Sequence, residues 1–65
     1  KNNKEAIVFA EKISVKNAPT MNSEEVFILH EGTKVFVLDA LDNWKKIKLA
    51  DGKQGWINAK EIKEL

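Results

Sequence analysis

The sequence contains no cysteine, and its 65 residues include only one proline and three glycines. Without cysteine the chain has neither a disulfide nor a thiolate-bound metal cluster, so side-chain packing alone must stabilise the fold. No apolar run approaches the roughly 20 residues of a membrane-spanning helix. We therefore expect no direct insertion into a membrane.

An excess of charge of one sign is also lacking. Eleven Lys and Arg residues oppose ten Asp and Glu residues, which gives a net charge of +1. Nucleic-acid-binding domains usually carry a concentrated basic field, and here only Lys45, Lys46 and Lys48 form a local basic cluster. A solvated strand face explains this cluster, and phosphate binding by a small barrel that stacks bases on Trp44 is the alternative. We expect no nucleic-acid partner.

Residues 1–5, KNNKE, are polar and have the composition of a linker end. The remaining residues, 6–65, form a single domain near the lower length limit for independent folding, since so short a chain buries only about 60% of its unfolded surface. Because the sequence begins at Lys1 rather than methionine, we expect it to be part of a larger protein. We expect the isolated domain to be monomeric.

Alternating and β-branched runs predict an all-β fold. The expected strands lie at 6–10, 13–16, 26–29, 34–41, 44–49 and 54–57. Residues 62–65 fit a closing strand, and an α-helix over 59–65 is the alternative. Short strands at regular spacing with turns between them are typical of a small barrel. The prediction is a barrel of five to six short antiparallel strands with one 3₁₀ turn.

Turn-forming residues separate these strands. Residues 17–23 are rich in turn formers and predict a loop. Gly32 is expected at positive φ in a tight turn, and the Asp51-Gly52 pair is a strong hairpin signal. The 3₁₀ turn is expected at 58–61.

Strand alternation separates the two tryptophans. Because strand side chains alternate between two faces, Trp44 points to the same face as Lys46 and to the opposite face from Ile47. Because lysine is almost never fully buried, Trp44 is expected on a solvated face, where it is a candidate contact residue. Trp56 follows Gly55, whose missing side chain lets a backbone or a large ring approach closely. We expect Trp56 to be half-buried over Gly55 as part of the barrel wall.

The residue types needed for catalysis or metal binding do not form a recognisable set. His30 is the single histidine, and sequence logic pairs no nucleophile with it. The aspartates lack the spacing of a calcium loop and fit turn positions instead. We expect a non-enzymatic domain with no catalytic residue, no metal site and no cofactor.

Three segments resemble the bacterial SH3-like domains of the SH3b family. The family's opening pattern LNVRSGP is similar to ISVKNAP at 13–19. Its middle segment is similar to EGTKV and the following VL within 31–38. Its closing pattern GW-x-K-V…DG-x-x-GWV is similar to the segment from NWKKI to DGKQGWI at 43–57. The resemblance covers about 13–62, and the last segment is its most specific part. It implies a small SH3-like barrel.

The chain also departs from the patterns that it resembles. Lys16 and Ala18 stand where the bacterial family usually has arginine and glycine, so a role that needs a bidentate guanidinium is not implied. The closing segment is similar to the eukaryotic SH3 pattern as well, and Trp44 matches the first tryptophan of its polyproline groove. Asn58 replaces the proline of that groove, Glu61 replaces its tyrosine, and the chain has no tyrosine. Because a polyproline ligand needs aromatic ridges to pack between, we expect no PxxP binding.

The SH3b resemblance implies a non-catalytic binding or targeting module. Its ligand would be a cell-wall peptide, such as a peptidoglycan stem peptide, or a segment of another protein. We place the candidate site on the face of Trp44, where Asn17, Asn58 and Glu61 could hydrogen-bond a peptide that packs against the indole.

The chain is also similar to the C-terminal SH3-like domain of exported tetratricopeptide-repeat proteins, which include the aerotolerance (Bat) type of Bacteroides-like bacteria. The similar segments are HEGTKV, NWKKI-x-LADG and GWI. This similarity implies a location in the periplasm or cell envelope. It also supports an alternative hypothesis, a structural docking domain with no free ligand. Such a domain would pack its Trp44 face against the helical repeats of the parent protein.

Overall fold

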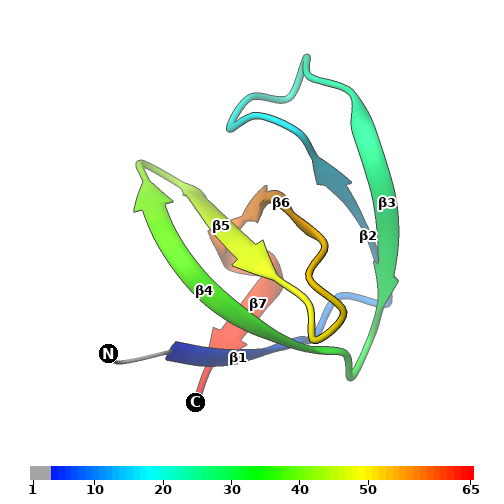
Figure 1. Cartoon of the computed structure of the whole chain (residues 1–65), viewed down its shortest axis with the longest axis vertical. Coiled ribbons are helices and arrows are strands. Elements are labelled where there is room, and N and C mark those ends of the chain that lie inside the picture. The colour runs from blue at the N-terminus through cyan, green and yellow to red at the C-terminus, as the bar shows by residue number, and fades with distance from the viewer. Residues whose placement is uncertain (1–3) are drawn as a thin grey trace.

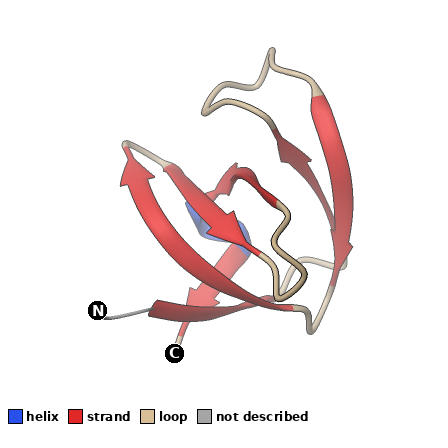
Figure 2. Ribbon diagram, in the orientation of Figure 1, coloured by secondary structure: helices blue, strands red, loops and turns tan. Residues whose placement is uncertain are grey.

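Seven short strands and one 3₁₀ turn form the fold of residues 4–65, which are the residues that the computed structural model describes (Figures 1 and 2). The elements are β1 (Lys4–Val8), β2 (Lys12–Lys16), β3 (Glu25–His30), β4 (Lys34–Leu41), β5 (Trp44–Lys48), β6 (Gln54–Asn58), η1 (Ala59–Glu61) and β7 (Ile62–Glu64). The predicted all-β class and the single 3₁₀ turn are confirmed.

The seven strands make one antiparallel sheet in the order β3-β2-β6-β5-β4-β1-β7. The eight-residue β4 pairs with β1 along its first half and with β5 mainly along its second half, so it joins β1 and β7 to the rest of the sheet. In Figure 1 the β2–β3 hairpin stands opposite the β4–β5 hairpin, and β1 and β7 cross below them. The sheet thereby curls around a single interior as a small barrel.

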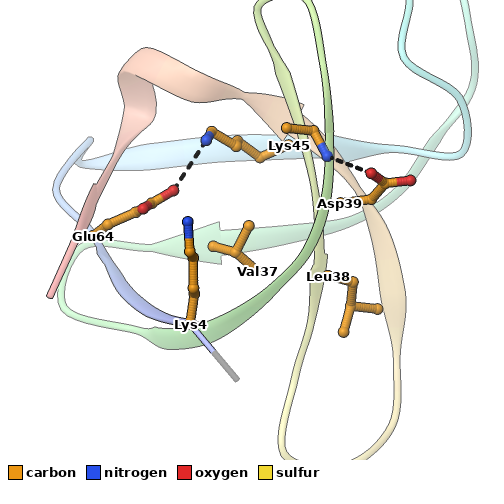
Figure 3. Close-up of a pocket in the computed structure, with 7 residues that line it drawn as sticks. Lys4, Val37, Leu38, Asp39, Lys45 and Glu64 are labelled. Atoms are coloured by element: carbon orange, nitrogen blue, oxygen red, sulfur yellow. Dashed lines mark hydrogen bonds and ion pairs between the residues drawn. The ribbon is translucent and has the colours of Figure 1, made fainter. Parts of the chain in front are cut away.

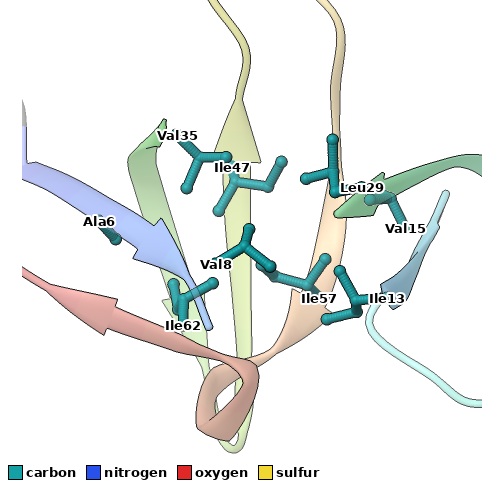
Figure 4. Packing of buried hydrophobic residues seen from close by; sticks show 9 residues of the cluster. All are labelled: Ala6, Val8, Ile13, Val15, Leu29, Val35, Ile47, Ile57 and Ile62. Carbon is teal, nitrogen blue, oxygen red and sulfur yellow. The ribbon is translucent and has the colours of Figure 1, made fainter. Parts of the chain in front are cut away.

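Inward-facing residues of all seven strands fill that interior (Figure 4). The buried apolar residues are Ala6, Val8, Ile13, Val15, Leu29, Val35, Ile47, Ile57 and Ile62. All nine are aliphatic, and β1, β2 and β6 show the alternation of buried and less buried positions that a half-exposed sheet requires. Neither tryptophan belongs to the core, so both indoles are left for the surface.

Three expectations about the elements need correction. The structure has seven strands rather than five or six, and the predicted closing strand is confirmed as β7 against β1. The alternative α-helix over 59–65 is therefore wrong. The first strand starts at Lys4, which pairs with Val37 of β4. Lys4 and Glu5 are thus part of the sheet rather than of a linker, and residues 1–3 of the expected linker lie outside the described residues.

The turns follow the residues that favour them. Gly32 has φ +90° and Gly52 has φ +97°, and the positive φ expected at Gly32 is confirmed. Asp42 has φ 54°, a value that aspartate tolerates better than most side chains. Because Leu41 pairs directly with Trp44, this tight turn sets the position at which Trp44 begins β5.

Candidate functional site

Trp44 lies half-buried at the start of β5, on the outer face of the sheet. It pairs with Leu41 of β4 on one side and with Asn58 of β6 on the other. Ile47, which has the opposite parity, is fully buried in the core. The predicted face of Trp44 agrees with this geometry, and the register brings Asn58 next to the indole.

A groove of about 280 Å³ lies beside Trp44. It is lined by Lys12, Ile13, Ser14 and Lys16 of β2, Met21 of the following loop, Trp44 of β5, Asn58 of β6 and Glu61 of η1. Three of the four predicted site residues therefore meet at one place. The volume is just below the roughly 300–1,000 Å³ of typical small-molecule pockets, which suits a few side chains of an extended peptide.

Asn58 connects the groove to η1. Its side-chain oxygen accepts a hydrogen bond of 3.2 Å from the backbone N–H of Lys60 and caps the 3₁₀ turn. The backbone N–H of Ala59 donates to the carbonyl oxygen of Asn43, immediately before Trp44, at 2.7 Å. These two bonds fix η1 against the start of β5, and the Asn58 amide NH₂ is the group left to donate to a ligand.

Asn17 is the predicted site residue that the structure does not bring to the groove. Its side chain is exposed and does not line the groove, while its backbone N–H donates to the carbonyl oxygen of Glu24 at 3.0 Å. The loop that begins there is held internally by Ser23, whose hydroxyl donates to the carbonyl oxygens of Ala18 and Thr20. This loop contributes Met21 to the groove instead.

The sequence reasoning missed the contribution of β2. Lys12, Ser14 and Lys16 share the outer face of that strand, because Ile13 and Val15 point into the core. Alternation alone predicts that shared face. What it does not predict is that β2 lies beside β6, a contact between residues far apart in the sequence, marked by the pair Lys16 and Trp56.

Trp56 shares the outer face with Trp44. Gly55 and Ile57 of the same strand are buried, so Trp56 points outward and is half-buried. In the β5–β6 register it is opposite Lys46, which makes the two tryptophans diagonal neighbours across adjacent strands. The expected half-burial of Trp56 is confirmed, and its indole lies on the same outer face as that of Trp44, so the two tryptophans are not separated by face.

Residues 11–63 match the family model of the bacterial SH3 domain. The chain belongs to the bacterial SH3 domain family. Domains of this family are non-catalytic binding domains that generally recognise peptide or protein segments, and they often occur in extracellular or envelope proteins. No curated protein matches the chain.

A second hollow of this bacterial SH3 domain, of about 240 Å³, lies on the other side of the β4–β5 hairpin (Figure 3). Lys45 lines it and pairs with Glu64 at 3.0 Å, and Asp39 accepts a hydrogen bond from the backbone N–H of Ala40. Lys45 is two residues before Ile47 in the same strand, so its side chain points to the same face as Ile47 and to the opposite face from Lys46. The basic cluster of the sequence is thus divided between two faces, which weakens the nucleic-acid alternative.

The ion pair in this second hollow predicts a pH dependence of stability. The hydrogen bond from Lys45, together with its positive charge, lowers the pKa of Glu64. A carboxyl group whose pKa is lowered on folding stabilises the fold above its unfolded pKa, and this stabilisation is lost as the pH falls through the folded pKa. Because both side chains are partly exposed, we expect Glu64→Gln to cost less than about 1 kcal/mol at neutral pH.

Urea unfolding of wild type and Glu64→Gln at neutral and acid pH measures this effect. The difference in unfolding free energy should shrink at acid pH, and Lys45→Gln should add little in the Glu64→Gln background. A difference that stays constant down to acid pH would contradict the assignment.

The Ser14 hydroxyl donates to Glu25 at 2.8 Å rather than to His30. Within residues 4–65 no group of three or more His, Cys, Asp or Glu side chains could hold a metal ion, and no helix there is long and apolar enough to cross a membrane.

Proposed function

We propose that this bacterial SH3 domain binds an extended peptide, either a cell-wall stem peptide or a protein segment, in the groove beside Trp44. The proposal rests on the observation that Trp44 of β5 lines one groove together with Asn58 and Glu61, which follow it by 14 and 17 positions in the sequence. An indole that lines a groove supplies contact area at little cost in side-chain entropy. The polar groups of Asn58 and Glu61 at its border supply orientation.

The chemistry of the groove supports a peptide other than a polyproline segment. One aromatic side chain lines it, next to the flexible thioether of Met21 and the aliphatic side chain of Ile13. A polyproline helix needs several aromatic ridges, whereas a methionine adapts to irregular side chains. Asn58 can donate a hydrogen bond and the Glu61 carboxylate can accept one, so together they suit a peptide backbone.

We further propose that the domain belongs to an exported or envelope-associated bacterial protein. The occurrence of the family in such proteins supports this location, as does the resemblance to the C-terminal domain of exported tetratricopeptide-repeat proteins. In that setting the domain would target its parent protein and leave any chemistry to other parts of the chain.

Two peptide probes test the groove. One is a peptidoglycan stem peptide, and the other is a neutral linear peptide with one leucine and one tryptophan among glutamine and serine residues. Titrated into the ¹⁵N-labelled domain, a binding probe should shift the indole N–H signal of Trp44 and the amide of Asn58. Trp44→Ala should weaken binding by at least about ten-fold, as expected for an aromatic residue central to an interface, while the fold is retained.

Leu38→Ala is the matched control, because Leu38 is an exposed apolar residue that lines the second hollow rather than the groove. It should leave the affinity unchanged. Shifts scattered over the whole domain, or equal losses in both variants, would contradict the proposed site. No shift with either probe would contradict peptide binding by the isolated domain and favour docking against the parent protein.

A further inference from the structure

Trp56 stands between two lysines on the outer face of the sheet. It pairs with Lys16 of β2 on one side and with Lys46 of β5 on the other. All three side chains are half-buried, as expected where lysine stems lie along an aromatic ring and keep their ammonium groups in water. Neighbouring strands are about 4.8 Å apart, so the two lysines flank the indole on its two sides. The three residues lie across β2, β6 and β5, next to Trp44 and its groove.

These two ammonium groups have no carboxylate within ion-pair distance among residues 4–65. The ion pairs of that part of the chain use Lys34, Lys45 and Lys53 instead. Glu25 is the cross-strand neighbour of Lys16, and Asp39 that of Lys46. Each of these carboxylates accepts a hydrogen bond from a neutral donor instead.

The Glu25 carboxylate accepts the hydroxyl of Ser14, and the Asp39 carboxylate accepts the backbone N–H of Ala40, both at 2.8 Å. The ammonium groups of Lys16 and Lys46 therefore lie beside the half-buried Trp56 indole, and Lys16 also lines the groove. Positive charge bordering an apolar contact surface favours partners with complementary negative charge.

We propose that the peptide bound in the groove is acidic, and that its carboxylates pair with Lys16 and Lys46 while an apolar side chain packs on Trp44 and Trp56. This inference rests on the proposed peptide-binding function and names the class of peptide. The two lysines are two strands apart, or about 10 Å. An extended peptide with three residues per left-handed turn rises about 3.1 Å per residue, so acidic residues three positions apart point to the same side and match the two cations.

The charge distribution favours a peptide over a nucleic acid. Glu61 lines the groove, and Glu25 and Asp39 are the cross-strand neighbours of the two lysines that flank Trp56. A continuous phosphate backbone would meet these carboxylates at every step, whereas a peptide can place negative charge only where the lysines stand. The net charge of +1 also gives little general attraction for a polyanion.

Three versions of the neutral linear probe test the proposal. They differ only at two positions three residues apart, which carry Glu, Gln or Lys, and affinity is measured by titration at low and high salt. The Glu peptide should bind about three- to ten-fold more tightly than the Gln peptide at low salt, as expected for two exposed charge pairs. The Lys peptide should bind most weakly, and salt should reduce the differences.

The variant Lys16→Gln/Lys46→Gln should remove the preference for the Glu peptide. Lys34→Gln/Lys63→Gln is the matched control, since it removes the same charge from exposed positions on β4 and β7 and should keep the preference. Equal affinities for the Glu and Gln peptides would overturn this inference and leave the groove proposal standing. A preference that survives in Lys16→Gln/Lys46→Gln would overturn the assignment to these lysines.

Two further outcomes distinguish a failure of the acidic-peptide inference from a failure of the proposed peptide-binding function. If none of the three peptides nor the stem peptide binds, the proposed function fails and this inference fails with it. If a single-stranded oligonucleotide shifts the Trp44 and Trp56 indole signals and binds more tightly than the Glu peptide, the partner is a nucleic acid and the peptide assignment is overturned.

Discussion

Gly55→Ala is expected to lower the unfolding free energy of the domain by about 1–3 kcal/mol, the usual range for overpacking a tight interior. Gly55 is buried in β6, where β2 crosses closely. A Cβ atom at this position would overlap the Cγ1 methyl of Val15 and lie 3.0 Å from the carbonyl oxygen of Lys16. Val15 is fully buried and stiff at χ1, so it has little room to rotate away.

A double-mutant cycle with Val15→Ala tests this mechanism. Removing the Val15 methyl groups opens the space that the new Cβ needs, so Gly55→Ala should cost clearly less in the Val15→Ala background than in wild type. Urea unfolding of the four proteins gives the coupling energy. Gly52→Ala is the control, because Gly52 has φ +97° and nothing lies within 4 Å of its added Cβ. Its cost comes from the backbone alone and should be the same in both backgrounds.

Additive costs at Gly55 and Val15 would show that close contact between β2 and β6 is not the reason for the glycine. The prediction also concerns function, because the same contact places Lys16 beside Trp56. A domain weakened at this contact should lose peptide affinity along with stability. Gly52→Ala acts at the far hairpin and should affect stability alone.

Local patterns predicted much of the fold because the strands obey them closely. The β4 strand lies at Lys34–Leu41 as expected, and β5, β6 and η1 lie within one residue of their predicted limits. Each is bounded by a turn whose residues favour it, such as Gly32 at positive φ. The solvated face of Trp44 followed from its parity with Lys46.

What local patterns could not supply is the pairing of distant strands. β2 meets β6 through Lys16 and Trp56, 40 positions apart in the sequence, and no turn residue or alternation encodes that neighbour. The four groove residues of β2 were missed for this reason. Lys4 was assigned to a linker because it is polar, although its partner Val37 makes it part of a sheet. An exposed end of a strand needs no apolar residue and leaves no hydrophobic signal.

The direction of Trp56 was undetermined for a related reason. Parity requires that Trp56 and Ile57 point to opposite faces, but it does not say which face is the interior. Size suggested that the tryptophan would fill the wall of the barrel. The core instead consists of nine aliphatic side chains, and Ile57 is the residue that points inward. A narrow barrel crossed by close strands has room for branched aliphatic groups and little room for an indole.

Ile47→Ala is expected to remove a large part of the unfolding free energy of the domain. Ile47 is fully buried between Val37 of β4 and Gly55 of β6. Since Gly55 has no side chain, the neighbouring strand offers little that could move into the vacated space. Truncation of a buried isoleucine costs about 2–5 kcal/mol, and a chain of this length has a total stability of only about 3–10 kcal/mol.

Ile47→Val is the milder, quantitative test of the same position. Removal of one buried methyl group costs about 0.5–1.5 kcal/mol, which corresponds to a fall of several degrees in Tm for a domain of this size. Lys48→Ala is the matched control on the next residue of β5, where the side chain is exposed. It should change stability by less than about 0.5 kcal/mol. Equal melting temperatures for Ile47→Val and Lys48→Ala would contradict the inward parity of Ile47, and with it the outward parity that places Trp44 and Lys46 on the binding face.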